Sequence, residues 1–414
     1  APIRDRFVLD QVVIDDAPRF GWRGVMLDVA RHFRPLPELL RFVELLSLHK
    51  YNVFHLHLTD DQGWRLASDR HPRLQEVASW RSETLTRNTQ PGDGTPHGGF
   101  YTADQLRSLV RYAADRGITI VPEIDLPGHV RAVLAAYPEL GNQRDTQHEV
   151  ATSFGIFPEV LSLNETSLQF VFDVFTELLE IFPGRHVHVG GDECPTEEWL
   201  ASPAAAGLAE ERGLAGPGEL QRWFTEQLHR WLTARERRLV GWDEITDGIV
   251  ERGPVTGAVV MAWRDRSYGI AAAAAGLDVV MAPESHCYLD HYPSEQPEEA
   301  YAIGGLLTTE DVYGFEPLDG VPAADHAHIV GTQVQLWSEY IPTIRRLDYL
   351  MFPRACAHSE VAWSQPSGRS WAEFQPRLAA HLERLAAIGV EFRPEPGPRP
   401  WQRGGSGVFR RDHR

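Results

Sequence analysis

Residues 117–129 read GITIVPEIDLPGH, and this stretch combines the two features that decide the fold prediction. Its first half, Ile118–Glu123, is a short and mostly apolar run of the length expected for a buried strand. Its second half is polar, with Asp125 and His129 on either side of a Pro-Gly turn. A buried strand that runs into charged side chains is typical of a parallel α/β sheet, because such sheets carry their chemistry at the carboxyl ends of the strands.

The same pattern recurs along the chain and predicts eight parallel strands. They are expected at Gly24–Val29, Val53–Leu58, Ile118–Glu123, His186–Val189, Arg238–Gly241, Val259–Ala262, Val279–Ala282 and Val330–Gln333. Amphipathic stretches predict helices at Leu36–His49, Thr102–Arg116, Glu165–Phe182, Glu219–Arg235, Tyr268–Ala275, Leu347–Ala362 and Trp371–Ile388. Eight alternating units of this kind predict an α/β fold of the (β/α)8 TIM-barrel class with long βα loops. A doubly wound open sheet is the alternative that the pattern leaves open.

The barrel is expected to occupy residues 19–392 as one catalytic domain. Residues 1–18 form a lead-in segment, and residues 393–414, rich in Pro and then Gly, form an extended tail. Two Gly- and Pro-rich stretches, Pro91–Gly99 and Ala201–Gly218, are interpreted as surface loops. Residues 1–20 lack the basic and then apolar pattern of a secretory signal, so the sequence assigns no compartment.

The composition excludes several classes of partner. The 414 residues carry 40 Lys and Arg against 58 Asp and Glu, a net charge of −18. Such a surface repels nucleic-acid phosphates and anionic lipids, so we expect no nucleic-acid partner and no membrane surface. The three cysteines match no zinc-binding spacing, and three buried thiols are favoured over one disulfide pair; they are Cys194, Cys287 and Cys356.

The predicted strand ends are rich in carboxylates and aromatic rings. They carry Asp28, Arg31, His32, Asp60, Asp61, Asp125, His129, Asp192, Glu193, Trp242, Trp263, Tyr288, Asp290, Trp337 and Glu339. Sugar rings stack on Trp, and their hydroxyls pair with Asp, Glu and Arg. Carboxyl groups cleave glycosidic bonds, with one of them held protonated as the acid. The convergence of these residues on one rim favours a carbohydrate hydrolase, although each residue alone is more often explained by packing or solvation.

The pair Asp192-Glu193 is the sharpest of these features. Two glycines precede it and allow close backbone approach, and adjacent side chains leaving a strand point in different directions. One carboxyl group can then face a leaving-group oxygen while the other faces another part of the sugar. The alternative is that the pair only caps a following helix.

Two His-x-His patterns suggest a rival chemistry. His55 and His57 on one strand, and His186 and His188 on another, have the spacing at which side chains share a face. Such pairs can bind a metal ion, and Asp60, Asp125 or His129 would complete the site. A metal-dependent barrel hydrolase is therefore the alternative at this stage.

From Ala17 to Trp363 the chain resembles glycoside hydrolase family 20, the β-N-acetylhexosaminidases. The resemblance rests on seven motifs in the family's order: RFGWRG (19–24) with LDVARHF (27–33), NVFHLHLTDDQGWR (52–65), GGFYT (98–102) with GITIVPEIDLPGH (117–129), HVGGDECP (188–195), GWDE (241–244), SHCYLD (285–290) and GTQVQLWSE (331–339).

The resemblance implies a retaining mechanism in which the 2-acetamido oxygen of the substrate is the nucleophile, an exception to the two-carboxylate scheme. Carried over residue by residue, Glu193 is the general acid and then the base. Asp192 orients the acetamido N–H and stabilises the oxazolinium intermediate, and Tyr288 binds the acetamido oxygen. No cofactor is implied.

The resemblance also implies how the sugar is held. Trp242, Trp263 and Trp337 would wall the acetamido pocket. The ring hydroxyls would be gripped by Arg23, Asp290 and Glu339, which makes the enzyme exo-acting. A supporting network near the acid and the arginine would consist of Asp60, Asp125 and His129. The His55/His57 pair then becomes packing around the site, with no metal bound.

Two departures from the family pattern affect these expectations. Most members carry an α/β domain before the barrel, whereas about twenty residues precede Trp22 here. Either that domain has been removed from this sequence or the protein lacks it, and in the second case an exposed barrel flank could serve as the contact face of a homodimer. The segment 291–315 lacks a Trp that many relatives place in the pocket. Either the pocket is open on that side or a tyrosine takes its place, namely Tyr292, Tyr301 or Tyr313.

The resulting hypothesis is release of terminal β-linked GlcNAc, with GalNAc as a further substrate, from N-acetylhexosamine glycans or chitooligosaccharides. A related enzyme that releases a disaccharide or a substituted GlcNAc is the near alternative. A catalytically silent sugar-binding module is disfavoured by the intact Asp192, Glu193 and Tyr288.

Overall fold

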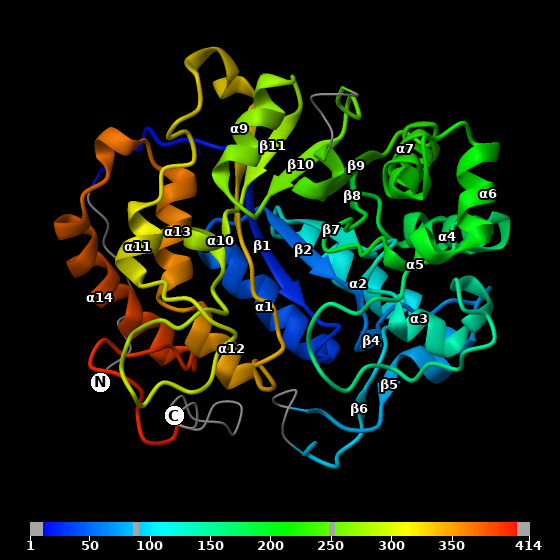
Figure 1. Ribbon diagram of the computed structural model, residues 1–414. Helices are drawn as coiled ribbons and strands as arrows, with labels where there is room; N and C mark the ends of the chain where they lie inside the picture. Colours follow the sequence, from blue (N-terminus) through cyan, green and yellow to red (C-terminus); the bar gives the residue numbers. More distant parts are fainter. Residues whose placement is uncertain (1–10, 86–90, 248–252, 404–414) are drawn as a thin grey trace.

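The computed structural model describes residues 11–85, 91–247 and 253–403, and eight parallel strands form a closed barrel at its centre (Figure 1). The barrel order is β1-β12-β11-β10-β9-β8-β7-β2, with β1 paired to β2 to close the ring. The strands are β1 (Trp22–Asp28), β2 (Val53–His57), β7 (Thr119–Glu123), β8 (His186–His188), β9 (Arg238–Trp242), β10 (Val259–Ala262), β11 (Asp278–Met281) and β12 (Ile329–Val334). All eight predicted strands are present, and the closed ring excludes the open sheet.

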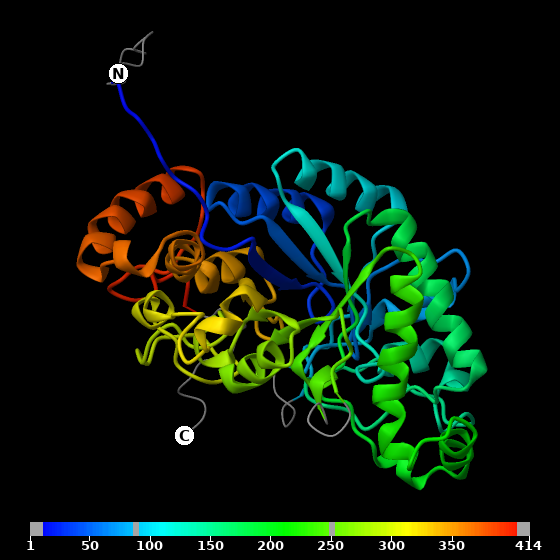
Figure 2. The same cartoon turned by 90° about the horizontal axis from the view of Figure 1, so that it is seen from above.

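Helices surround the barrel and cover its outer face (Figure 2). The longer ones are α1 (Leu36–Leu48), α2 (Ala103–Ala114), α4 (Glu165–Ile181), α7 (Leu220–Thr233), α9 (Arg266–Ala274), α12 (Ile344–Met351), α13 (Arg354–Trp363) and α14 (Trp371–Ala387). Local chemistry fixes their starts: Thr102 caps α2 in a capping box with Gln105, and Asn164 caps α4. The buried faces of these helices join the strands in one core.

Shorter elements build the loops at the carboxyl end of the barrel. They are the strand pairs β3 (Thr59–Asp60) with β4 (Gly63–Trp64) and β5 (Trp80–Arg81) with β6 (His97–Gly98), and the helices α3 (Arg131–Ala136), α5 (Glu197–Ala201), α6 (Pro203–Glu211), α10 (Glu284–Cys287) and α11 (Thr309–Gly314). Short helical turns lie at Leu74–Ala78, Pro138–Leu140, Pro217–Glu219, Asp243–Thr246, Ala323–His328 and Pro366–Gly368.

One loop prediction and one helix prediction need correction, and a proline explains each of them. The stretch 201–218 was expected to be a loop, but Pro203 occupies the first turn of α6, where its missing N–H costs no hydrogen bond, and Ser202 caps that helix. The single helix predicted over 347–362 is two helices, because Pro353 has no N–H with which to continue α12.

The chain segments outside the barrel differ in how they contact it. Residues 11–18 are mostly exposed and run away from the barrel (Figure 2), with Asp16 bonded to the indole of Trp363 at 2.7 Å. Residues 393–403 form turns without helix or strand, and Arg393 binds Glu299 at 2.7 Å. The remaining residues of the predicted lead-in and tail, 1–10 and 404–414, lie outside the described part of the chain.

The three cysteines are free thiols, as expected; Cys287 and Cys356 are buried, whereas Cys194 is only partly buried and not fully buried as predicted. Among the described residues, no helix has the length and apolar character needed to cross a bilayer.

Candidate active site

A cavity of about 520 Å³ opens at the carboxyl ends of the barrel strands. Its walls come from strand ends and from the loops that follow several strands, which is where a TIM barrel places its chemistry. The lining residues are Arg31, Phe154, Gly155, Ile156, Asp192, Glu193, Trp242, Trp263, Glu284, Tyr288, Asp290, His291, Ile303, Gly304, Gly305, Trp337, Glu339 and Tyr340. Most of the predicted site residues therefore meet in one place.

The turn after β8 brings Asp192 and Glu193 into this cavity. Gly190 and Gly191 have φ of +70° and +98°, and a side chain at Gly190 would collide with the Asp125 carboxylate. Only glycine fits both the backbone conformation and the space at this position. Glu193 itself has φ of +45°, a conformation that non-glycine residues seldom adopt and that often marks a functional site.

Asp192 is a buried carboxyl group, 8% exposed. Burial raises its pKa to about 6, and the nearby carboxylates of Glu123 and Glu193 act in the same direction, against His129. Its Oδ1 atom has no hydrogen-bond partner among the described residues. A buried oxygen without a partner is costly in a folded protein, so Asp192 is suited to accept a hydrogen bond from a ligand in the cavity.

Glu193 lies nearer to solvent, with about a third of its side chain exposed. Its Oε2 atom is 3.6 Å from His129 Nε2, and the same ring nitrogen is 3.8 Å from Asp192 Oδ2. The two carboxyl groups thus share one imidazole but differ in burial. Such a difference in environment is how enzymes separate the roles of paired carboxyl groups.

An aromatic wall faces this pair. Tyr288 and Trp263 are stacked with ring centroids 6.1 Å apart, and Trp242 and Trp337 are 5.7 Å apart. Burial raises the pKa of the Tyr288 hydroxyl well above its usual value, so this hydroxyl keeps its proton as a hydrogen-bond donor. The four rings offer apolar faces and one polar tip, which suits an amide-bearing sugar substituent.

The carboxyl groups of Glu123 and Glu244 hold two of these tryptophans. Trp242 donates from Nε1 to Glu123 Oε1 at 2.9 Å, and Trp263 donates from Nε1 to Glu244 Oε2 at 2.9 Å. Burial, together with Asp192 and Asp243, raises the pKa of Glu244 to about 8. No role was predicted for Glu244 from the sequence, although the residue belongs to the GWDE motif that also contains Trp242.

The arginine of the pocket is Arg31, and the assignment to Arg23 is wrong. Arg23 lies at the amino-terminal start of β1, where it donates to the carbonyl oxygens of Lys50 and Phe20 and stacks on Trp363, at the end of the barrel opposite the cavity. Arg31 follows β1, lines the cavity and lies over the Trp337 ring at 5.0 Å.

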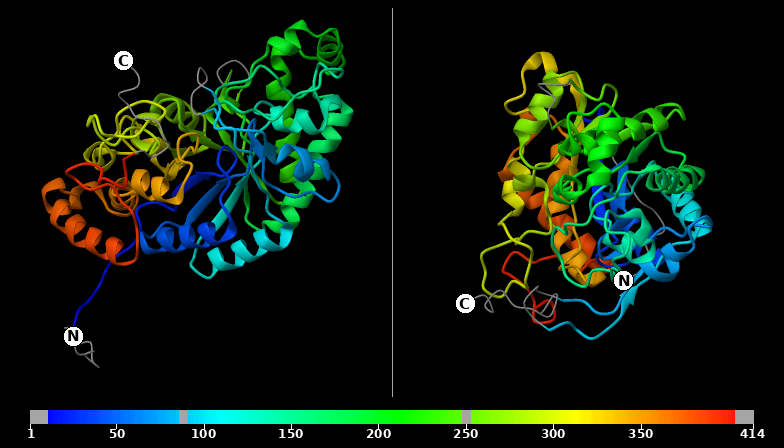
Figure 3. Two further views of the ribbon diagram at one scale, coloured as in Figure 1. Left: turned by 90° about the horizontal axis from the view of Figure 1, so that it is seen from below. Right: turned by 45° about the vertical axis from the view of Figure 1, so that its right-hand side comes forward.

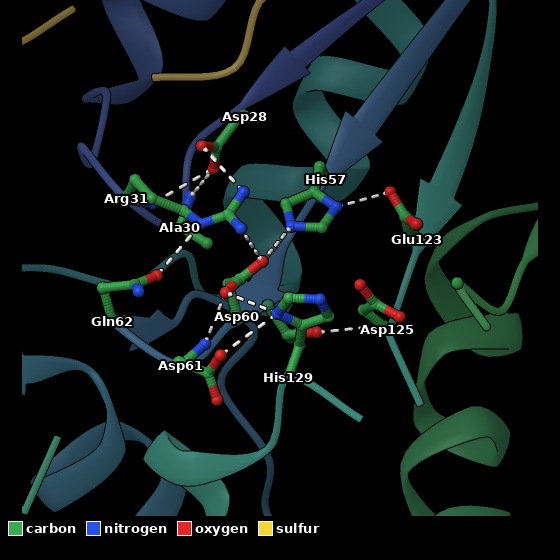
Figure 4. Close-up of polar contacts among 12 residues, drawn as sticks. Asp28, Ala30, Arg31, His57, Asp60, Asp61, Gln62, Glu123, Asp125 and His129 are labelled. Carbon is green, nitrogen blue, oxygen red and sulfur yellow. Dashed lines mark hydrogen bonds and ion pairs between the residues drawn. The ribbon is translucent and has the colours of Figure 1, made fainter. Parts of the chain in front are cut away.

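A chain of buried ions connects Arg31 through Asp60 to His129 (Figure 4), and His129 lies next to Asp192 and Glu193. Arg31 Nη2 lies 2.8 Å from Asp60 Oδ2, and Asp60 Oδ1 lies 3.3 Å from His129 Nδ1. Arg31 and His129 lower the pKa of Asp60 strongly despite its burial. Asp60 and Asp61 in turn keep the pKa of His129 well above its usual value, so the imidazole near Glu193 carries positive charge. The predicted network is thus present, but it centres on Arg31.

Asp125 belongs to the same region without touching Arg31. Its Oδ1 accepts the Gly191 N–H at 3.2 Å, which braces the turn that presents Asp192 and Glu193. Burial and the neighbouring Asp192 raise its pKa well above the usual value.

Asp290 and Glu339 line the cavity as carboxyl groups available to a ligand. Both carboxylate oxygens of Asp290 lack a partner among the described residues, and burial raises the pKa values of Asp290 and Glu339 to about 6 and about 7. Carboxylate oxygens that protein groups leave free can accept bonds from sugar hydroxyls.

The side of the pocket that lacks a Trp is closed differently from the expectation. Ile303, Gly304 and Gly305 line it, whereas Tyr292, Tyr301 and Tyr313 do not belong to the cavity lining. Tyr313 packs on Phe374 and bonds to Glu360 well away from the pocket, and Tyr301 contacts the lining residue Tyr340.

The His-x-His residues surround one buried carboxylate. Glu123 Oε2 lies 2.9 Å from His55 Nε2 and 2.5 Å from His57 Nδ1, while Oε1 lies 2.9 Å from His188 Nδ1. These groups contain enough donor atoms for a metal ion. Glu123, however, also accepts the Trp242 indole N–H, so the cluster as it stands supports the aromatic wall. His186 lies apart, against Trp22.

Known proteins resemble this chain closely. A β-hexosaminidase of Porphyromonas gingivalis is 40% identical over 402 residues, which cover 96% of this chain and 50% of that protein. The crystal structure of a β-N-acetylhexosaminidase matches with a TM-score of 0.85 and 35% identity, covering 95% of this chain and 81% of that one.

A second solved structure shares the fold and was determined with a sugar bound. It is the exo-β-N-acetylglucosaminidase of Vibrio harveyi in complex with N-acetylglucosamine, with a TM-score of 0.80, 35% identity, and coverage of 92% of this chain and 60% of that one. The chain spans half the length of the Porphyromonas relative. The family description "Glycosyl hydrolase family 20, catalytic domain" matches residues 20–366, and the chain therefore belongs to glycosyl hydrolase family 20.

Proposed function

We propose that this protein is an exo-acting, retaining β-N-acetylhexosaminidase that removes terminal β-linked GlcNAc by substrate-assisted catalysis. One observation carries the proposal. Asp192 presents an unpartnered, buried oxygen to a cavity walled by Trp242, Trp263, Trp337 and the Tyr288 hydroxyl. A 2-acetamido group has an N–H for the carboxylate, a carbonyl oxygen for the tyrosine and a methyl group for the rings.

In the first step the acetamido oxygen attacks the anomeric carbon while the bond to the leaving group breaks. Asp192 accepts the acetamido N–H and stabilises the positive charge that develops on the resulting oxazolinium ring. A carboxylate fixed in a low-dielectric site needs no reorganisation at that moment, which is why such groups contribute strongly to catalysis. Tyr288 donates to the attacking oxygen and orients it.

Glu193 donates its proton to the glycosidic oxygen and later removes one from the attacking water. Its partly exposed position at the mouth suits both the departing aglycone and the entering water. His129 lies 3.6 Å away and carries the charge set by Asp60 and Asp61, so it orients Glu193 and balances the carboxylate left after proton transfer.

Arg31, Asp290 and Glu339 are proposed to bind the hydroxyls on the far side of the ring. A guanidinium held by Asp60, Gln62 and Asp28 has a fixed orientation, which favours selective hydrogen bonding. These groups end the cavity, and a site closed around a terminal sugar favours release of one residue at a time from chitooligosaccharides or related glycans.

A cyclised thiazoline mimic of the oxazolinium intermediate tests the proposal. It should bind far more tightly than GlcNAc itself, because ligands that resemble the reacting state gain the stabilisation meant for that state. Equal affinity for the two compounds would contradict substrate assistance. Product analysis from a chitooligosaccharide separates GlcNAc release from disaccharide release, and a matched β-GalNAc substrate tests the second epimer.

A further inference from the structure

A second cluster of metal-binding side chains lies far from the sugar pocket. It contains His49 at the end of α1, Cys356 in α13 and His381 in α14, whose donor atoms all lie within 4.8 Å of one another. The cluster borders a separate cavity of about 570 Å³. Figure 3 shows α13 and α14 in orange and red together at one edge of the molecule, next to the blue of α1.

The hydrogen bonds of His49 leave the lone pair of its Nε2 atom facing two neighbours, His381 and Cys356. Its Nδ1 lies 2.7 Å from the Leu45 carbonyl oxygen, which can only accept, so Nδ1 carries the proton. The Nε2 lone pair therefore points toward His381 Nε2 at 2.9 Å and Cys356 Sγ at 3.4 Å. One lone pair pairs well with one donor, whereas a cation placed between the three atoms would accept electron pairs from all of them.

The backbone bond of His49 is also the arrangement that metal-bound histidines commonly have. The ring nitrogen away from the metal usually donates to a carbonyl or carboxylate, which fixes the orientation and the protonated nitrogen. A histidine binds a metal ion as the neutral imidazole, and because Nδ1 of His49 carries the proton, its Nε2 is the nitrogen with a lone pair for the ion.

We propose that His49, Cys356 and His381 form a zinc-binding site that ties the C-terminal helix α14 to the barrel. Two imidazole nitrogens and one thiolate match the preference of Zn²⁺, with a solvent molecule from the adjoining cavity as the fourth ligand. The donor spacing is close to what is needed: tetrahedral zinc places two nitrogens about 3.3 Å apart and a nitrogen and a sulfur about 3.6 Å apart. His381 is only partly buried on an outer helix, so it has room for the small shift required.

The four other candidate groups among the described residues differ from this one. They are built from Asp, Glu and His around the sugar site and contain no thiol. Their oppositely charged members already neutralise one another, as Glu123 and His57 do. The Cys356 cluster has no carboxylate, and its only route to a negative charge is loss of the thiol proton.

Zinc binding must therefore release one proton. An ordinary cysteine thiol has a pKa of about 8.5, so at neutral pH the sulfur is protonated without metal. When the Zn–S bond forms, the S–H bond breaks and the proton goes to the buffer, while the two neutral imidazoles release none. No oxidant or reductant takes part.

Titration of the metal-free protein with Zn²⁺ in buffers of different ionisation enthalpy tests the proposal. We expect one zinc per chain and release of close to one proton at neutral pH. Substitution of Co²⁺ should give the near-ultraviolet charge-transfer band of a cobalt–thiolate bond. No binding, or binding without proton release and without that band, would overturn the assignment.

Variants identify the ligands. His381→Ala changes a half-exposed helix position and should fold normally; it should weaken zinc binding by more than about 10-fold, the loss that even an outer partner of a metal ligand commonly causes. Cys356→Ser should remove the cobalt band. His328→Ala is the matched control, because that ring lies beside Asp278, and it should bind zinc as the wild type does. Equal affinity in His381→Ala and wild type would refute the site.

The proposed site predicts a stability effect that is independent of sugar hydrolysis. Saturating Zn²⁺ should raise the Tm of the wild type and leave that of His381→Ala unchanged, because only the native arrangement brings the three helices together. Activity should be the same with and without zinc. A Tm rise of equal size in both proteins would show that zinc binds elsewhere.

Discussion

His129 Nε2 lies 3.6 Å from Glu193 Oε2 and 3.8 Å from Asp192 Oδ2, so one charged imidazole serves both carboxyl groups of the proposed catalytic pair. The two carboxyl groups have different surroundings: Asp192 is buried among aromatic rings, and Glu193 is at the mouth. This difference supports the proposed charge-stabilising role of Asp192 and the proposed proton-transfer role of Glu193.

Glu193→Gln should separate substrates by their leaving group. The amide cannot donate an acidic proton, so kcat on chitooligosaccharides should fall by about 10²- to 10⁴-fold, the range typical of a lost general acid. An aryl glycoside with a good leaving group needs less assistance and should lose much less in its first step. Glu197→Gln, an exposed position four residues on, is the control and should be normal. Equal losses on both substrates would remove the acid role from Glu193.

Asp192→Asn should lower kcat on aryl β-GlcNAc by about 10²- to 10³-fold, the usual cost of losing one preorganised charge-stabilising group. The side chain keeps its size, so the loss would come from the missing charge. Steady-state kinetics with the folded variant measure it, and circular dichroism checks the fold. A rate near that of the wild type would mean that another group stabilises the intermediate.

The pH profile of kcat/KM should have an acidic limb near pH 6. The pKa of Asp192 is raised to about 6, and its active form is the anion, so activity should fall as the pH drops through that value and recover above it. In Asp192→Asn the limb should shift, because one of its titrating groups is gone. A limb identical to that of the wild type would assign the transition to Asp290 and the other pocket carboxyl groups.

Arg31 and Arg23 offer a matched comparison at the two ends of β1. Arg31→Lys removes the planar guanidinium from the pocket and should cost about 1.5–3 kcal/mol, or about 10- to 100-fold in kcat/KM. Arg23→Lys should leave kcat/KM unchanged, since Arg23 binds backbone carbonyls at the opposite end. The reverse result would restore the assignment that the structure corrects.

Glu244 should act as a positioning residue through Trp263. Glu244→Ala leaves the indole N–H without its acceptor, and kcat/KM on aryl β-GlcNAc should fall by about 10-fold or more. Glu244→Gln keeps a carbonyl oxygen at the same place and should retain most of the activity. If the Gln and Ala variants lose equally, the hydrogen bond from Trp263 does not explain the effect of Glu244.

The barrel was predictable because its strands are short, apolar runs that alternate with amphipathic helical stretches, so that the pattern alone located all eight. The same strand pattern also indicates that Arg31, and not Arg23, lies in the pocket. A residue that precedes a parallel strand lies at the end opposite the chemistry, whereas Arg31 follows the strand. In the sequence the two arginines look alike, since both flank the same apolar run.

Other features depend on contacts that the sequence does not display. Glu244 matters because its carboxylate meets the Trp263 indole across two loops. The wall formed by Ile303 depends on Gly304 and Gly305, whose φ values of +157° and +63° set the path of the loop. The zinc-site candidate joins residues more than 300 positions apart, His49 and Cys356, with no motif between them.

Hydrolysis of aryl β-GlcNAc beside the matched aryl β-glucoside, each with and without EDTA, tests the central claim most directly. The two substrates differ only at the 2-position, where substrate assistance needs the acetamido group. We expect cleavage of the acetamido sugar alone, at a rate that EDTA does not change. Equal cleavage of both sugars would make a protein carboxylate the nucleophile and contradict the mechanism, and loss of activity with EDTA would restore the metal-dependent alternative.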